Sequence, residues 1–399
     1  MKILHTADWH LGKKLEGYDR DDEQKAFLDE ICYIANDENV DMIIIAGDIY
    51  DIPNPPTYAE RLFYEYLKKL SDNGKRAIIV IAGNHDNPRR LTASNPLAYE
   101  YGILLFGEPF EKKEIGKYGN FLITKSYEGA VQLELNGKKV FLNVLPYASE
   151  KTLNMKISEN IDDENRQTKY SEFIGEILNK NLEYKDKDAY HIIVSHLFIN
   201  GVKDSEIEGS ERNIEFGGIY AVDLKDIPAA NYVALGHIHK CIKYKNNICY
   251  SGSPLEYRLT ENLHDKRVLI VDIDGDNTVI KDRMLENIKP IKKYILTGIE
   301  NAIKLSLEKI DVSEWIYLTI YTDRPIKTSE LYQIKSNKNI IVIEPIINAE
   351  KRDLINKGEF KIDDEKSIVE AFKEFYYEKN NVYPVDQIVN EFLNCLEEN

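Results

Sequence analysis

The chain has 399 residues, of which 43% are hydrophobic and 30% are charged, and its formal net charge is −16. This length predicts two or three domains rather than one core, and the composition is typical of a globular protein. The negative charge argues against a protein that coats nucleic acid nonspecifically, although a local phosphate-binding site remains compatible with it.

The ends and the cysteines of the chain indicate its compartment. The first residues form a strand-like run without the apolar core of a signal peptide, and no apolar run reaches the roughly 18 residues of a membrane span. The four cysteines show no C-x-x-C spacing. We therefore expect a cytoplasmic protein with reduced thiols and no membrane association.

Five short apolar runs predict buried strands, and each is followed at once by polar residues. Runs rich in Ile and Val and bounded by glycine are typical of strands buried on both faces. Ligands of open α/β sheets bind at the carboxyl ends of such strands. The runs are residues 3–4, 42–46, 78–82, 192–194 and 232–235.

Helical patterns separate several of these runs. Apolar residues recur at spacings of three and four from Phe27 to Ile34 and from Tyr170 to Leu178, and Thr57-Tyr-Ala-Glu60 has the spacing of a capping box at a helix start. The first elements thus predict parallel strands with right-handed crossovers, whereas residues 118–147 predict antiparallel strands with a turn at Asn136-Gly137. Both a single mixed sheet with helices and a two-sheet sandwich flanked by helices fit this order.

The composition changes near residue 285. We predict a first domain over residues 1–285 and a small α+β domain over 286–350, with strands near Tyr294, 315–321 and 340–343 and a helix across 299–310. Apolar spacing within residues 366–399 predicts a pair of amphipathic helices.

The polar residues after the five runs are suited to bind metal ions. Residues two apart on an extended strand point to the same side, so each of two D-x-H and H-x-H pairs can converge on one ion. Seven donors exceed one four-coordinate site but suit two ions that share a carboxylate, and imidazole with carboxylate and no thiolate favours manganese, iron or zinc. The predicted ligands are Asp8, His10, Asp48, Asn84, His196, His237 and His239.

The remaining polar residues of this set have other predicted roles. His85 is placed to act as an acid–base group over the substrate, and Asp86 to orient its loop. His191 precedes its strand, so it would lie at the wrong end of the sheet to be a ligand. His5 and His264 occur in no motif and are interpreted as structural.

The motifs D-x-H, G-D-x-x-D, G-N-H-D and G-H-x-H, with a lone histidine after the fourth run, resemble those of the calcineurin-like metallophosphoesterases. Within that family, ADWHLGKKL, GDIYD followed by a proline pair, and SGSP are similar to the nuclease subunits of double-strand-break repair complexes. The resemblance extends over essentially the whole chain. It implies a β-sandwich flanked by helices, a small capping domain and a C-terminal helical pair.

The resemblance implies two manganese ions. One would be held by Asp8, His10, Asp48 and His239, and the other by Asp48, Asn84, His196 and His237, with Asp48 bridging. His85 would protonate or stabilise the leaving oxygen without binding metal. Archaeal members have a histidine where this chain has Asp51, and the role of Asp51 stays open.

The resemblance also implies an activity and partners. We expect a manganese-dependent DNA nuclease at the nucleoid, with 3′→5′ exonuclease activity on double-strand ends and endonuclease activity on hairpins. The terminal helix pair would bind the coiled coil of an SMC-like ATPase, and the helix with Tyr58, Leu62 and Tyr66 would form a homodimer interface with residues 97–101. Candidate DNA-contacting residues are Lys13, Lys14, Arg89, Arg90, Lys240 and Arg258.

Two other functions remain open at this point. A phosphatase or nucleotide phosphodiesterase of the same fold would share the metal ligands. Protein phosphatases usually have G-N-H-E and an arginine after G-D-x-x-D, and Asp86 and Ile52 occupy those places here. A non-catalytic scaffold for the ATPase is the third possibility, and the complete ligand set argues against it.

Overall fold

The structure is a computed structural model that describes most of the first 347 residues. The described residues are 1–149, 152–153, 163–200, 221–245, 247–257, 266–286, 289–310 and 312–347, with Pro384 and Val389. The predicted terminal helix pair and Arg258 therefore lie outside the described residues. The chain divides into two compact units, the first made of Met1–Tyr294, Lys309–Tyr317 and Lys338–Val342, and the second of the remainder.

The first sheet is built on parallel strands separated by helices. Its strands β1 to β4 pair in parallel, and β13 adds to β1 in the antiparallel direction. All five residues of β2 and of β3 are buried, which explains their continuous apolar sequences. In order across the sheet, the strands are β14 (Asn277–Met284), β13 (Arg267–Asp274), β1 (Lys2–Thr6), β2 (Met42–Ala46), β3 (Ala77–Ile81) and β4 (Ile103–Phe106).

The second sheet has eight strands and mixed direction. Strands β8, β9, β10 and β12 run parallel, whereas β5 to β8 form an antiparallel meander whose last turn is Asn136-Gly137, as predicted. In order across the sheet, the strands are β11 (Ile242–Tyr244), β12 (Ile248–Tyr250), β10 (Tyr232–Gly236), β9 (Tyr190–His196), β8 (Lys138–Leu145), β7 (Ala130–Leu135), β6 (Phe121–Tyr127) and β5 (Gly116–Tyr118).

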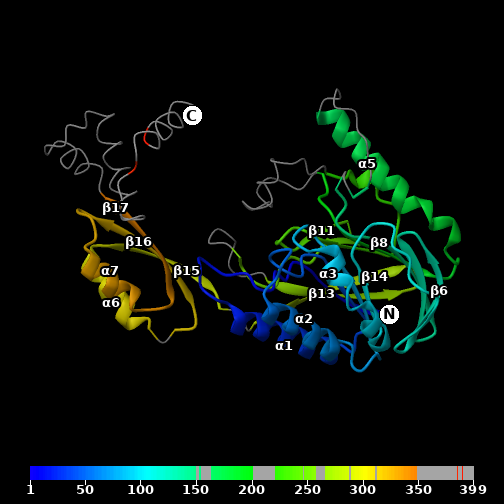
Figure 1. Ribbon diagram of the computed structural model, residues 1–399, viewed down its shortest axis with the longest axis horizontal. Helices are drawn as coiled ribbons and strands as arrows, with labels where there is room; N and C mark the ends of the chain where they lie inside the picture. Colours follow the sequence, from blue (N-terminus) through cyan, green and yellow to red (C-terminus); the bar gives the residue numbers. More distant parts are fainter. Residues whose placement is uncertain are drawn as a thin grey trace. The chain divides into compact units, whose positions relative to one another are not determined.

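Three layers of apolar side chains hold these sheets and helices together. Alternate residues of β2 face opposite ways: Ile43 and Ile45 pack against α1 (Asp21–Asp37) and α2 (Thr57–Leu70), whereas Met42 and Ile44 pack between the two sheets. The outer face of the second sheet packs against α5 (Asp163–Lys180). Figure 1 shows α1 and α2 on one side of the sheets and α5 on the other. The two-sheet alternative is therefore correct.

Several short helices connect these elements. Pro88–Thr92 forms α3 and Asn95–Ala98 forms α4, and both follow β3. Single 3-10 turns occur at η1 (Tyr99–Tyr101), η2 (Leu182–Tyr184) and η4 (Leu224–Asp226). Across the described ranges, no helix is long and apolar enough to cross a membrane.

The capping box predicted for α2 is wrong. The residue before the helix is Pro56, Thr57 is already helical, and no side chain caps the first turn. Glu60 instead accepts hydrogen bonds from the Arg90 guanidinium, with Arg90 Nε 2.7 Å from Glu60 Oε1. A charge-assisted, two-pronged bond of this kind is stronger than a neutral capping bond, so Glu60 turns to Arg90.

The third sheet contains the strands predicted for the C-terminal part of the chain. Its order is β15 (Ile291–Thr297), β16 (Trp315–Thr322) and β17 (Ile340–Ile347). The predicted helix is α6 (Ile299–Glu308), and a second helix, α7 (Thr328–Lys335), was not predicted. Only Ile334 of α7 is buried, so its sequence lacks the apolar spacing from which helices are predicted.

Candidate metal centre

Loops at the carboxyl ends of β1, β2 and β10 hold predicted ligands in unusual backbone conformations. Asp8, His10, Asp48 and His237 have φ values of 55°, 43°, 49° and 98°. Residues other than glycine adopt this left-handed region at a cost of about 1–3 kcal/mol each, and they concentrate at functional sites. These four residues thus adopt destabilising backbone conformations that set the direction of their side chains.

The two sheets approach each other closely at this end. His196 Nδ1, on β9, lies 2.8 Å from the carbonyl oxygen of Ala46 on β2. A Cβ atom at Gly236 would collide with that same carbonyl, and a Cβ atom at Gly83 would collide with Asp48. The glycines that end these strands therefore allow ligands from different sheets to converge.

One group of predicted ligands forms around His10. Its Nε2 atom lies 3.1 Å from Nε2 of His239 and 3.6 Å from Oδ2 of Asp48. One ligand atom each from Asp8, His10 and His239 lies within 4.8 Å of the others. Asp8 and His10 are fully buried and His239 is partly exposed, so the group opens to solvent on one side.

A second group forms around Asn84. Its Oδ1 atom lies 3.0 Å from Nε2 of His196 and 3.1 Å from Nδ1 of His237. Nε2 of His196 is also 3.4 Å from Oδ2 of Asp48. Ligand atoms of Asp8, Asp48 and His196 lie within 4.8 Å of one another. Asp48 therefore lies between the two groups, where the predicted bridging ligand must be.

The hydrogen-bonding capacity of these atoms fits a bound cation. His196 Nδ1 donates to the Ala46 carbonyl, so Nε2 of the neutral ring is an acceptor, yet it faces the oxygens of Asn84 and Asp48, which are acceptors too. Only a proton or a metal ion at Nε2 makes this arrangement favourable. Imidazole, carboxylate and amide oxygen are ligands of manganese, iron and zinc.

The pKa values point to the same excess of negative charge. Burial raises the pKa of Asp8 to about 7. Burial alone would lower the pKa of His196, but the carboxylates of Asp48 and Asp8 outweigh it and raise that pKa to about 9. In the metal-free site a protonated His196 thus supplies the positive charge that the two buried carboxylates require.

The G-N-H-D loop after β3 presents His85 next to these groups. The Nδ1 atom of His85 lies 2.7 Å from the backbone oxygen of Asp51, and its ring contacts that of His10 at 4.8 Å between centroids. A proton on Nδ1 leaves Nε2 available. Asp86 accepts hydrogen bonds from the backbone N–H groups of Gly83, Ile49 and Tyr50 and so orients the loop, as predicted.

Tyr257 was not identified from the sequence, and the contacts of Asp51, whose role the sequence left open, were not predicted. The ring of Tyr257 packs edge-on against His10 and His239, and its hydroxyl donates to the carbonyl of Trp9, between two predicted ligands. Asp51 contacts Lys13, His10 and His85. Tyr257 follows the SGSP motif by three residues, which was its one sequence signal.

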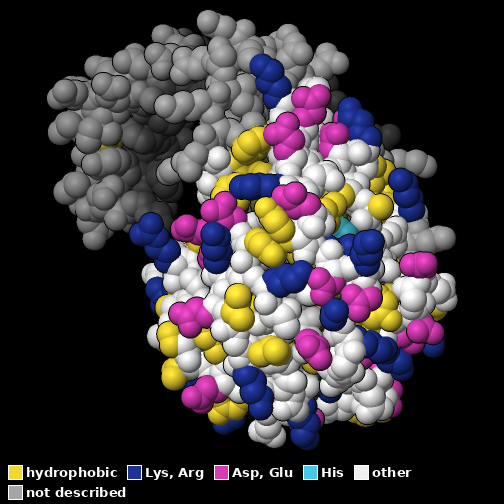
Figure 2. Space-filling model, turned by 90° about the vertical axis from the view of Figure 1, so that its right-hand side faces the viewer, with side chains coloured by type: hydrophobic (Ala, Val, Ile, Leu, Met, Phe, Trp, Pro, Cys, Tyr) yellow, Lys and Arg dark blue, Asp and Glu magenta, His cyan; other side chains and the backbone are white. Residues whose placement is uncertain are grey.

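The candidate phosphate-binding residues are not equivalent. Lys13 lies beside the predicted ligands: its Nζ atom is 2.6 Å from Oδ1 of Asp51, which is 3.6 Å from Nδ1 of His10. Lys14 pairs with Asp19 at 2.9 Å, and Arg90 is bound to Glu60. Arg89 is exposed, with its Nε atom 3.7 Å from Glu108, and Lys240 is also exposed. On the face shown in Figure 2, Lys and Arg side chains alternate with Asp and Glu, so no broad basic surface covers it.

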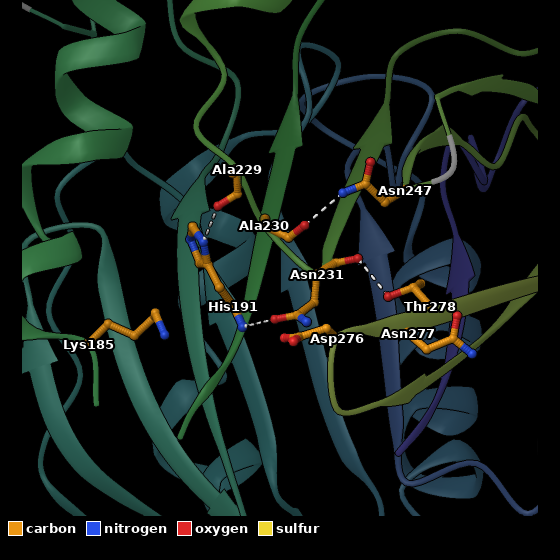
Figure 3. Close-up of a pocket in the computed structure, with 9 residues that line it drawn as sticks. All are labelled: Lys185, His191, Ala229, Ala230, Asn231, Asn247, Asp276, Asn277 and Thr278. Carbon is orange, nitrogen blue, oxygen red and sulfur yellow. Dashed lines mark hydrogen bonds between the residues drawn. The ribbon is translucent and has the colours of Figure 1, made fainter. Parts of the chain in front are cut away.

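A large polar hollow of about 490 Å³ lies at the other end of β9 and β10. Figure 3 shows the ring of His191 hydrogen-bonded to the backbone carbonyl of Ala229. The backbone N–H of His191 donates to the side-chain oxygen of Asn231, and the backbone carbonyl of Asn231 accepts from Thr278. These uncharged groups connect the loops that precede the two strands. As predicted, His191 lies away from the ligands, at the amino end of its strand.

Comparisons with known proteins place the chain among phosphoesterases. A family model for calcineurin-like phosphoesterases matches residues 1–241. The SbcD subunit of the nuclease SbcCD from Bacillus subtilis is 37% identical over 401 residues, covering 98% of this chain and 97% of that protein. The SbcD subunit from Staphylococcus epidermidis is 28% identical, covering 93% and 92%. A dimetal phosphatase structure from Danio rerio aligns over 72% of this chain and 96% of its own at 14% identity, with a TM-score of 0.39.

Proposed function

This chain belongs to the calcineurin-like phosphoesterase family, in the branch of the SbcD nuclease subunits, and from that premise we propose that it hydrolyses DNA phosphodiester bonds with two manganese ions. The observation that supports this most directly is the convergence of seven donors from five strand ends around Asp48. The proposed substrates are double-strand ends, degraded 3′→5′, and hairpins. The proposed partner is an SbcC-type ATPase, bound through residues 366–399.

The proposed ligand sets follow the two groups of side chains. Asp8, His10, Asp48 and His239 would hold one ion, and Asp48, Asn84, His196 and His237 the other. Two divalent ions so bound would activate a water molecule for attack and neutralise the negative charge that develops at phosphorus.

The chain's own residues supply the remaining chemistry. His85 is the proposed catalytic residue because its Nδ1–H donates to the Asp51 carbonyl, so that the doubly protonated ring directs its Nε2–H to the leaving oxygen and returns to the neutral form when it gives up that proton. Asp86 holds the loop on which His85 lies through three backbone N–H groups. Lys13 is the proposed phosphate-binding cation nearest the ligands.

A small domain over residues 286–350 is the proposed cap over the substrate. Arg89 and Lys240 are exposed enough to bind backbone phosphates, whereas Lys14 and Arg90 would first have to leave their carboxylate partners. Recognition would depend on phosphate contacts and end geometry, since the sequence contains no base-reading motif.

A second copy of this chain is the proposed occupant of an apolar groove beside α2. The groove has a volume of about 430 Å³, and among its lining residues Leu97 is 75% exposed and Tyr64 is 36% exposed. Most of the apolar residues of α2, including Phe63, Tyr66 and Leu67, are buried in the core of the first unit. The interface would therefore centre on Leu97. Leu97→Lys is expected to halve the mass seen in sedimentation equilibrium, whereas Ile115→Lys, also at an exposed position, leaves it unchanged. A monomeric parent protein would contradict the dimer.

The function is tested by comparing two substrates with and without His85. Purified protein with manganese should cleave a labelled DNA hairpin, and His85→Ala should keep both ions yet lose about 10²- to 10⁴-fold in turnover. Cleavage of a small phosphodiester but not of DNA would favour a phosphatase or nucleotide phosphodiesterase. Cleavage of neither, even with the ATPase and ATP present, would favour a non-catalytic scaffold.

A further inference from the structure

Asp51 contacts three functional groups at once. Its Oδ1 atom lies 2.6 Å from Nζ of Lys13 and 3.6 Å from Nδ1 of His10. Its backbone oxygen lies 2.7 Å from Nδ1 of His85. Asp51 thus joins a predicted ligand, the proposed catalytic histidine and the nearest cation.

The same atoms resemble a third metal site, but a cation of the chain already lies there. Ligand atoms of His10, Asp51 and His85 lie within 4.8 Å of one another. The ammonium of Lys13 binds the Asp51 carboxylate directly, and the Nδ1 proton of His85 is directed to the Asp51 carbonyl. The cluster is thus arranged around an ammonium rather than around a further ion.

Nδ1 of His10 adds a second observation. It is buried and has no hydrogen-bond partner, and a carboxylate oxygen of Asp51 lies 3.6 Å from it. Imidazoles that bind metal through one nitrogen usually donate the other N–H to a carboxylate, which fixes the ring. Asp51 is placed to accept that bond while it holds Lys13.

We propose that Asp51 is a positioning residue that holds the ammonium of Lys13 beside the metal centre as the binding group for a non-bridging phosphate oxygen, while its backbone carbonyl fixes His85. The proposal rests on the proposed function, since it assumes a phosphate ester at this centre. An ammonium has three N–H donors, and Asp51 engages one of them, so donors remain for the substrate. The side chains of Lys13 and Asp51 are 24% and 23% exposed, so an incoming phosphate can reach the pair.

If the Lys13–Asp51 ion pair only stabilised the fold, removing it would have little effect on phosphate binding. Ion pairs with this exposure contribute little to the free energy of unfolding. Lys125 and Asp186 form a pair elsewhere with the same 2.6 Å separation and side chains 33% and 29% exposed, and Asp186 also binds Lys139, so its loss removes at least as much ion pairing. Asp186→Asn is therefore the control for loss of an ion pair as such.

The test measures binding of inorganic phosphate to the manganese-loaded protein by calorimetry. Asp51→Asn and Lys13→Gln are each expected to weaken phosphate binding about tenfold, and the double variant no further, because both changes remove the same positioned cation. Lys13→Arg should recover much of the affinity. Asp186→Asn should bind as the parent does. At saturating manganese the stoichiometry should stay unchanged in every variant, because an asparagine oxygen at position 51 can still accept from Nδ1 of His10.

Hairpin cleavage adds a readout that a structural role would not move. In the Asp51→Asn variant, KM should rise about tenfold with kcat changed less than threefold, since the lost interaction is mainly with the ground-state phosphate. Multiplying effects in the double variant would overturn the proposal, as would an unchanged phosphate affinity or a loss of manganese from Asp51→Asn. If the parent binds phosphate but cleaves no DNA, the proposed function fails, and the phosphate measurement still decides the role of Asp51.

Discussion

The opposite ends of β9 and β10 each carry a buried histidine with oxygen partners, but only the carboxyl ends place carboxylates beside it. At the amino ends, His191 donates to the Ala229 carbonyl, its own N–H is bound by Asn231, and the Asn231 carbonyl accepts from Thr278. At the carboxyl ends, His196 Nε2 faces two oxygen acceptors, and Nε2 of His237 is buried without a partner.

This difference identifies the functional end better than polarity or cavity size does. The hollow at the amino ends has a volume of about 490 Å³ and is lined by polar residues, yet the two ring nitrogens of His191 face only uncharged oxygens, those of Ala229 and Asn143. At the carboxyl ends, the same fold brings the buried carboxylates of Asp8 and Asp48 together beside His196 and places four non-glycine residues at positive φ. Buried charges that are brought together at a backbone cost are what a bound cation must neutralise.

Removing one negative charge should affect the two ends very differently, and the largest effect is expected at Asp48. Asp48→Asn keeps the size of the side chain but removes the charge shared by both groups. We expect manganese affinity to fall more than about 100-fold and hairpin turnover about 10³-fold or more. Metal content by mass spectrometry and single-turnover cleavage measure these losses.

Asp276→Asn provides the matched change at the opposite end. Asp276 lines the hollow of Figure 3 and is exposed, so its loss should leave metal content and turnover within about twofold. The comparison between the two ends fails if Asp48→Asn retains two ions, or if Asp276→Asn loses them.

Sequence was sufficient for the features that depend on short patterns. The apolar runs before Asp8, Asp48 and His196 are strands, because residues buried on both faces leave an uninterrupted apolar pattern. Their polar ends meet because parallel strands of two packed sheets end at the same edge. The helices α1, α2 and α5 follow from apolar spacing in the same way.

Sequence failed where the outcome depends on partners distant along the chain. Glu60 accepts a hydrogen bond from Arg90, 30 residues away, instead of forming the predicted capping box. Tyr257 reaches the carbonyl of Trp9 across 248 residues, and the three contacts of Asp51 come from two different loops. No local periodicity encodes such contacts. They determine how the ligands are held rather than which residues are ligands.

A smaller effect, on the free energy of unfolding, is expected from His191 at the amino ends of β9 and β10. Burial lowers the pKa of His191 to about 4 from an ordinary value of 6.5. Between these values the unfolded chain binds a proton that the folded chain excludes, so stability rises with pH. The contribution of His191 is therefore complete above pH 6.5 and is lost as the pH falls towards 4, by up to about 3 kcal/mol.

His191→Gln should remove this pH dependence while lowering stability at every pH. The replacement has no titrating group, but it cannot make both ring contacts to Ala229 and Asn143, so a constant loss is expected. Urea unfolding of metal-free protein between pH 4 and 7.5 gives the two free energies of unfolding, and their difference should shrink as the pH falls. A difference that stays constant with pH would mean that His191 takes up its proton equally in the folded and unfolded states, and the amino ends of β9 and β10 would then not stay neutral.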